Sequence, residues 1–202
     1  LSIAEEIAKM PKKQQPKRSQ IYIFTTAEEQ GLLGAEWYSR KPIVPLSKTV
    51  ANINVDGGNF YGLTKNYGAL GAERSNLWDV VQSVLKERNM TFLADKYPEQ
   101  GYFFRSDHFP FAKVGVPALS IRGGDEFVGK PKDFSDKLFA EFNTKHYHQP
   151  SDEFRDDWVF DGMVQMLDVT LAIGMNISNS KQIPRYKETD EFSAADKKRF
   201  EK

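Results

Sequence analysis

Hydrophobic residues along the chain occur in two different patterns, one typical of strands and one typical of helices. Short runs of β-branched and aromatic residues, bounded by turn-forming residues, predict strands at 21–26, 49–56 and 116–122. Apolar residues at helical spacing predict helices at 1–10, 31–40, 75–89 and 160–177. Neither pattern occurs in residues 123–143, which we expect to be a long loop.

The alternation of strands with helices indicates the fold class. It favours an α/β domain, a three-layer αβα sandwich around a mixed, mostly parallel central sheet. We expect this domain to cover residues 1–180. The remainder, 181–202, is rich in charge and is expected to be a loosely attached tail.

The composition of the chain limits which partners and which metal ligands are possible. Lys and Arg together number 28, as do Asp and Glu, so the chain has no net charge that would attract nucleic acid or an anionic membrane. No apolar stretch approaches the ~20 residues of a membrane-spanning helix. Cysteine is absent and only three histidines occur, so any metal would be bound by carboxylate and imidazole groups.

Acidic residues follow two of the predicted strands directly. Glu28 and Glu29 come after the first strand, and Asp56 closes the second. Ligands of open α/β sheets bind outside the carboxyl ends of the strands. Of two neighbouring acids, one can hold a metal ion while the other takes a proton from water that the ion activates. His148, in a polar turn, is the candidate nitrogen ligand, although each residue alone could equally be a helix-dipole acid, a turn acid or a surface histidine.

Five motifs in a fixed order carry a resemblance to a known family. They are TAEEQGLLG (26–34), NVD (54–56), SDH followed by PF (106–111), GVPA (115–118) and HQPSD (148–152). Together they make the chain similar to the M28 family of co-catalytic zinc aminopeptidases and carboxypeptidases, over residues 1–174. The resemblance implies a mixed sheet flanked by helices, with the site at the rim of the sheet.

The resemblance also implies residue roles. Glu28 would be the general base that accepts a proton from metal-bound water. Glu29 and His148 would ligate one zinc ion and Asp56 the second, giving two zinc ions in a complete site. The substrate would be a peptide.

The SDH segment would line the substrate pocket. Within it, Asp107 and His108 would contact the substrate, and His108 could donate a hydrogen bond to the substrate or to the developing oxyanion. In the family, a His-x-Asp motif and a zinc-bridging Asp precede the helix that here begins at Leu1. The chain contains neither, so we expect a C-terminal portion of a longer enzyme that binds zinc weakly and catalyses poorly.

The leading functional hypothesis is therefore a zinc-dependent exopeptidase, with an aminopeptidase favoured. Two alternatives stay open: a single-zinc acyltransferase resembling glutaminyl cyclases, and a non-catalytic binding module on the same scaffold. The family resemblance implies a secreted or periplasmic location. The sequence leaves open the side-chain preference, the direction of exopeptidase action and the oligomeric state.

Overall fold

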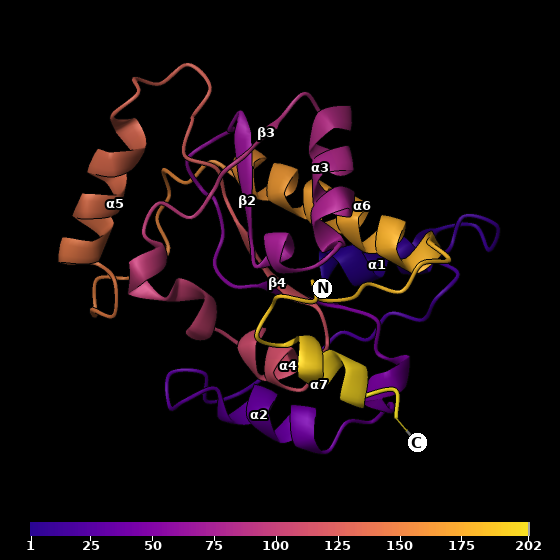
Figure 1. Ribbon diagram of the computed structural model, residues 1–202. Coiled ribbons are helices and arrows are strands. Elements are labelled where there is room, and N and C mark those ends of the chain that lie inside the picture. The colour runs from indigo at the N-terminus through magenta and orange to yellow at the C-terminus, as the bar shows by residue number, and fades with distance from the viewer. Residues whose placement is uncertain (202) are drawn as a thin grey trace.

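A mixed four-stranded sheet in the order β1-β4-β2-β3 forms the centre of the molecule, as the computed structural model shows for residues 1–201 (Figure 1). Its strands are β1 (Asn52–Val55), β2 (Asn66–Leu70), β3 (Thr91–Phe92) and β4 (Ala118–Arg122). The pairs β1/β4 and β2/β3 are parallel, whereas β2/β4 is antiparallel. The predicted αβα class is confirmed, with a mixed sheet in which parallel pairs predominate.

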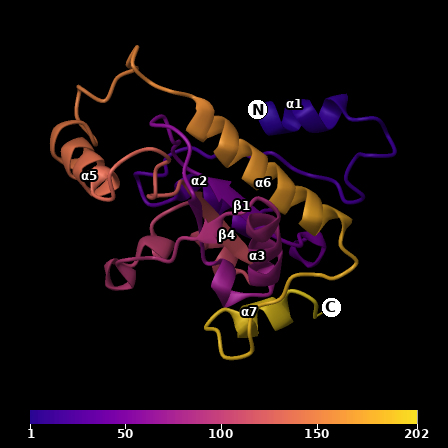
Figure 2. The ribbon, with the colours of Figure 1, turned by 90° about the horizontal axis from the view of Figure 1, so that it is seen from above.

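Helices cover both faces of this sheet. Those of more than one turn are α1 (Ser2–Lys9), α2 (Leu33–Arg40), α3 (Leu77–Glu87), α4 (Phe109–Lys113), α5 (Phe134–Lys145), α6 (Asp161–Asn179) and α7 (Ser193–Lys198). On one face α3 packs against α6, with α1 alongside α6 (Figure 2). On the other face α2 packs against α4, and α7 lies next to them (Figure 1). Within residues 1–201, no helix combines the length and apolarity needed to cross a bilayer.

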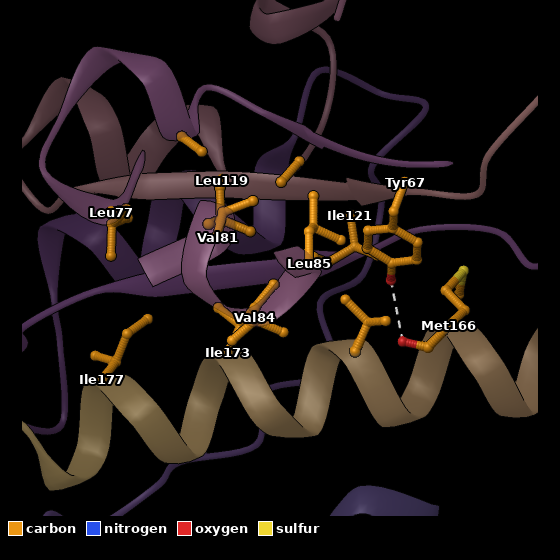
Figure 3. Packing of buried hydrophobic residues seen from close by; sticks show 13 residues of the cluster. Tyr67, Leu77, Val81, Val84, Leu85, Leu119, Ile121, Met166, Ile173 and Ile177 are labelled. Atoms are coloured by element: carbon orange, nitrogen blue, oxygen red, sulfur yellow. Dashed lines mark hydrogen bonds between the residues drawn. The ribbon is translucent and has the colours of Figure 1, made fainter. Parts of the chain in front are cut away.

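The larger hydrophobic cluster lies between the sheet, α3 and α6 (Figure 3). The predicted helical spacing places the apolar stripe of α3 inward, where Leu77, Val81 and Val84 are fully buried. The Tyr67 hydroxyl, also buried, donates a hydrogen bond to the Met166 carbonyl at 3.0 Å. A polar atom in the middle of the cluster is thereby satisfied, which avoids the cost of an unpaired buried group.

Two of the expected local structures are wrong. Residues 21–26 are extended but form no strand, because among residues 1–201 no neighbouring strand pairs with them. Ile21 is 48% exposed and Phe24 73% exposed, so the apolar side chains lack the half-buried surface on which strand preference depends. The expected loop at 123–143 contains α5, which has no buried residue and therefore little hydrophobic patterning.

The expectation of a loosely attached tail is also wrong. Asp196 is only 2% exposed and forms ion pairs with Arg185 at 2.8 Å and Arg199 at 2.9 Å. The Tyr186 hydroxyl donates to the Val116 carbonyl at 3.1 Å. The buried ion pair of Asp196 with Arg199, together with the Tyr186 hydrogen bond, therefore fastens this part of the chain to the domain. The domain boundary at residue 180 stays a prediction.

Candidate active site

The turn that carries Glu28 and Glu29 connects the extended segment 21–26 to α2. Ala27 has a φ of +56°, a left-handed conformation that is uncommon for residues other than glycine. The Gly34 N–H donates to the Thr26 carbonyl at 3.0 Å. A Cβ at Gly34 would lie 2.6 Å from the Thr26 nitrogen, so only glycine lets α2 approach this closely. The turn is therefore fixed by backbone geometry at both ends, at a cost in strain that is typical of functional sites.

Glu29 and His148, far apart in sequence, are in contact. The Nε2 atom of His148 lies 2.9 Å from Oε1 of Glu29. His148 has a φ of +58°, a second uncommon backbone conformation in this part of the molecule. Both side chains are more than half exposed, so the pair faces solvent and is accessible to an ion or a substrate.

Asp56, which directly follows β1, is held by a short chain of hydrogen bonds. The Ser106 hydroxyl donates to Oδ2 of Asp56 at 3.0 Å, and the Asn54 amide donates to the Ser106 hydroxyl at 2.8 Å. The next residue of the loop, Asp107, accepts a hydrogen bond from the Thr25 hydroxyl. These bonds tie the 106–108 loop to β1 on one side and to the segment that carries Glu28 on the other.

The pKa of Glu28 is affected by its partial burial and by three other acids. Partial burial raises the pKa of the Glu28 carboxyl, and repulsion from Glu29, Asp56 and Asp107 raises it further. His148 opposes this shift in pKa. A carboxyl whose pKa is raised above its ordinary value is better suited to accept a proton near neutral pH.

Tyr147 is a site residue that the sequence analysis missed. Its ring stacks on the imidazole of His148 at 3.9 Å between centroids. Partial burial, followed by the negative charges of Glu29, Glu28 and Asp56, raises the pKa of the Tyr147 phenol. The phenol therefore stays protonated at neutral pH and can donate a hydrogen bond. The sequence feature that could have indicated Tyr147 is its position directly before His148.

His108 lies behind the site rather than at its surface. The side chain is 0% exposed, and its ring meets the Phe103 ring edge to face at 4.7 Å. Burial lowers the pKa of the imidazole to about 4, and the charge of Arg122 acts in the same direction. The Phe103 backbone offsets part of the shift in pKa, although neither ring nitrogen makes a well-formed hydrogen bond with residues 1–201. A contact between His108 and substrate stays a prediction.

A pocket of about 590 Å³ opens next to the two glutamates. Its walls come from the turn, α2, α4 and the aromatic loop before α4: Glu28, Glu29, Gly31, Leu32, Glu36, Phe104, Arg105, Phe109 and Lys113. The Lys113 ammonium lies 2.6 Å from the Glu36 carboxylate, which neutralises it. The pocket is large enough to hold one or two amino-acid residues of a ligand.

The donor atoms fit a zinc ion only in part. Carboxylate and imidazole are suitable zinc ligands, and Glu29 and His148 already meet. At zinc–ligand distances of about 2.0–2.1 Å, two tetrahedral ligand atoms lie about 3.3 Å apart, so this pair would need to open only slightly. Across the described part of the chain, however, no three His, Asp or Glu side chains are grouped closely enough to hold a metal. Asp56 is directed to Ser106 instead.

Comparison with known proteins identifies the family. The model of peptidase family M28 matches residues 1–172, which is most of the 202-residue chain and includes every candidate site residue. No curated protein gives a significant match to the chain. The match covers far more than half of the sequence, and the chain therefore belongs to peptidase family M28, a family of metal-dependent peptidases.

Proposed function

We propose that the chain provides the catalytic residues of a zinc-dependent exopeptidase that acts on the amino end of peptides. The observation that carries this proposal is the contact between Glu29 and His148 beside Glu28. It joins two potential metal ligands from distant parts of the chain to a carboxyl group with a raised pKa. A scaffold that served only for binding would have no need for this combination.

Each residue has a distinct role in the proposed reaction. Glu29, His148 and Asp56 would hold zinc, which would supply an acidified water and a Lewis acid for the scissile carbonyl. Glu28 accepts the proton of the attacking water and passes it to the leaving amine. The Tyr147 phenol donates a hydrogen bond to the oxyanion that forms at the carbonyl oxygen.

Preference for the amino end follows from the charge around the site. Glu29, Asp56 and Asp107 all lie near enough to Glu28 to raise the pKa of its carboxyl. Such a concentration of negative charge attracts the α-ammonium group of a peptide and repels an α-carboxylate. The pocket beside the glutamates would accept the side chain of the terminal residue.

Substitution of the proposed base tests this function. Glu28→Gln keeps the size of the side chain but removes its basicity, so hydrolysis of leucine p-nitroanilide should fall by roughly 10²–10⁴-fold. Bound zinc, measured by atomic absorption, should not change. Glu87→Gln, on the exposed side of α3, is the matched control and should behave as the wild type.

The choice of substrates separates the alternatives. Peptides with a free amino terminus should be cleaved, whereas the same peptides with an acetylated amino terminus should not. Cyclisation of an amino-terminal glutamine without hydrolysis of the leucine substrate would instead favour an acyltransferase. Undiminished hydrolysis by the Glu28→Gln variant would exclude the proposed base.

A further inference from the structure

Residues 182–200, called here the C-terminal segment, lie behind the loop that forms one wall of the pocket. Phe192 in this segment is 7% exposed, and its ring centroid lies 6.0 Å from that of Phe103 and 6.2 Å from that of Phe109. Phe103 in turn touches Phe104 and His108 at centroid distances of 5.4 and 4.7 Å. Since Phe104 and Phe109 line the pocket, Phe192 is one ring behind its surface.

Arg74 joins the C-terminal segment to the same aromatic group. Its guanidinium lies 4.7 Å from the ring centroid of Phe103 and 4.8 Å from that of Phe192, so it contacts both rings. Asp190 and Glu191 hold it through ion pairs at 3.0 and 2.5 Å. Cation–π contacts are strongest when they are desolvated, as they are between these two buried rings.

The C-terminal segment is anchored on both sides of Phe192. Before it, the Tyr186 hydroxyl bonds to the Val116 carbonyl at 3.1 Å. After it, the Arg199 guanidinium donates to the Leu46 carbonyl at 3.1 Å. Ala195 packs so closely on Gly115 that a Cβ there would lie 2.3 Å from the Ala195 carbonyl carbon. Phe192 is therefore held in place relative to the core and does not hang from a free end.

We propose that the C-terminal segment sets the shape of the substrate pocket, with Phe192 as a positioning residue. The match to the peptidase family ends at residue 172, so the segment is a feature of this chain beyond the matched region. Phe192 holds Phe103, and Phe103 holds the loop 102–109 that presents Phe104 and Phe109 to the pocket. The effect on substrate rests on the proposed peptidase function, whereas the effect on the loop does not.

Two measurements on the full chain test the proposal. Phe192→Ala removes the ring behind the loop, so amide hydrogen exchange in 102–109 should accelerate by at least roughly tenfold. The KM for leucine p-nitroanilide should rise by roughly tenfold while kcat changes by less than about threefold, because the pocket is altered but the proposed base and metal ligands are not. Phe192→Leu keeps most of the bulk and should restore both quantities to near the wild-type values.

A control of similar burial separates positioning from general destabilisation. Leu85→Ala also truncates a fully buried side chain, but in the cluster between α3 and α6. It should leave both the exchange of 102–109 and KM close to the wild type. The proposal is overturned if exchange in 102–109 is unchanged in Phe192→Ala, or if Leu85→Ala alters it equally. If the wild type cleaves no peptide, the proposed function fails, and the exchange measurement still decides the role of the C-terminal segment.

Discussion

Acid should destabilise the protein through one buried side chain, His108. The imidazole is fully buried, and its pKa is lowered to about 4 from an ordinary value of about 6.5. As the pH falls below 6.5, the unfolded chain therefore binds a proton at this histidine before the folded protein does. The contribution to stability is complete above pH 6.5 and is lost as the pH falls towards 4.

The size of the effect follows from the difference in pKa. A shift of about 2.5 units corresponds to about 3.4 kcal/mol when the titration is complete, at 1.36 kcal/mol per unit. Between pH 7 and pH 4.5 the linkage relation gives a loss of about 2.4 kcal/mol in the free energy of unfolding. That is a large part of the roughly 5–15 kcal/mol by which domains are stable.

Urea unfolding followed by tryptophan fluorescence can isolate this contribution. The free energy of unfolding is measured at both pH values for the wild type and for His108→Phe, which keeps an aromatic ring, although a somewhat larger one, and has no titratable group. Carboxyl groups contribute equally to both proteins, so the loss on acidification should be smaller in the variant by about 2.4 kcal/mol. Equal losses in the two proteins would refute the reasoning and show that the folded protein tolerates a charged His108.

Three further predictions concern the site and the C-terminal segment. Calorimetric titration of the chain with zinc should give an affinity weaker than roughly micromolar that His148→Ala abolishes, because only Glu29 and His148 are already in contact; a stoichiometry of two with sub-micromolar affinity would contradict this. Tyr147→Phe should lower kcat by roughly 10²-fold without loss of bound zinc, and an unchanged kcat would exclude the proposed oxyanion contact. Asp196→Ala leaves the buried guanidinium of Arg199 without its ion-pair partner, so chemical denaturation should show a loss of roughly 3–5 kcal/mol, and a loss below 1 kcal/mol would contradict the assigned role.

The parts of the fold that the sequence predicts are those whose hydrophobic pattern reflects burial. The helix predicted at 75–89 is confirmed as α3, with its apolar stripe in the core. By contrast, β2 was not predicted, although all five of its residues are buried. Its sequence, NYGAL, contains asparagine and glycine, which are uncommon in strands, so only its tertiary neighbours reveal its conformation.

The C-terminal segment was misjudged because composition does not say how charges are paired. Asp190, Asp196 and Arg199 look like solvent-exposed residues in sequence, yet each ion pair that they make lies against the body of the molecule. Within the site, the ordered motifs singled out Glu29 and His148, which the structure brings into contact, whereas the roles of these residues stay predictions. The ring of Phe192 behind the aromatic wall was beyond the reach of such motifs, since its contact with Phe103 joins two distant parts of the chain.

The unpaired stretch Ile21–Phe24 has a consequence for how temperature should act on the protein. Glu28 and Glu29 follow a length of backbone that has no ladder to stiffen it, and the nearest side-chain anchor before them is the bond from Thr25 to Asp107. Structure with few backbone hydrogen bonds opens before the global transition. Warming should therefore loosen residues 21–24 first, while the central sheet and the turn that carries Glu28 and Glu29 are still intact.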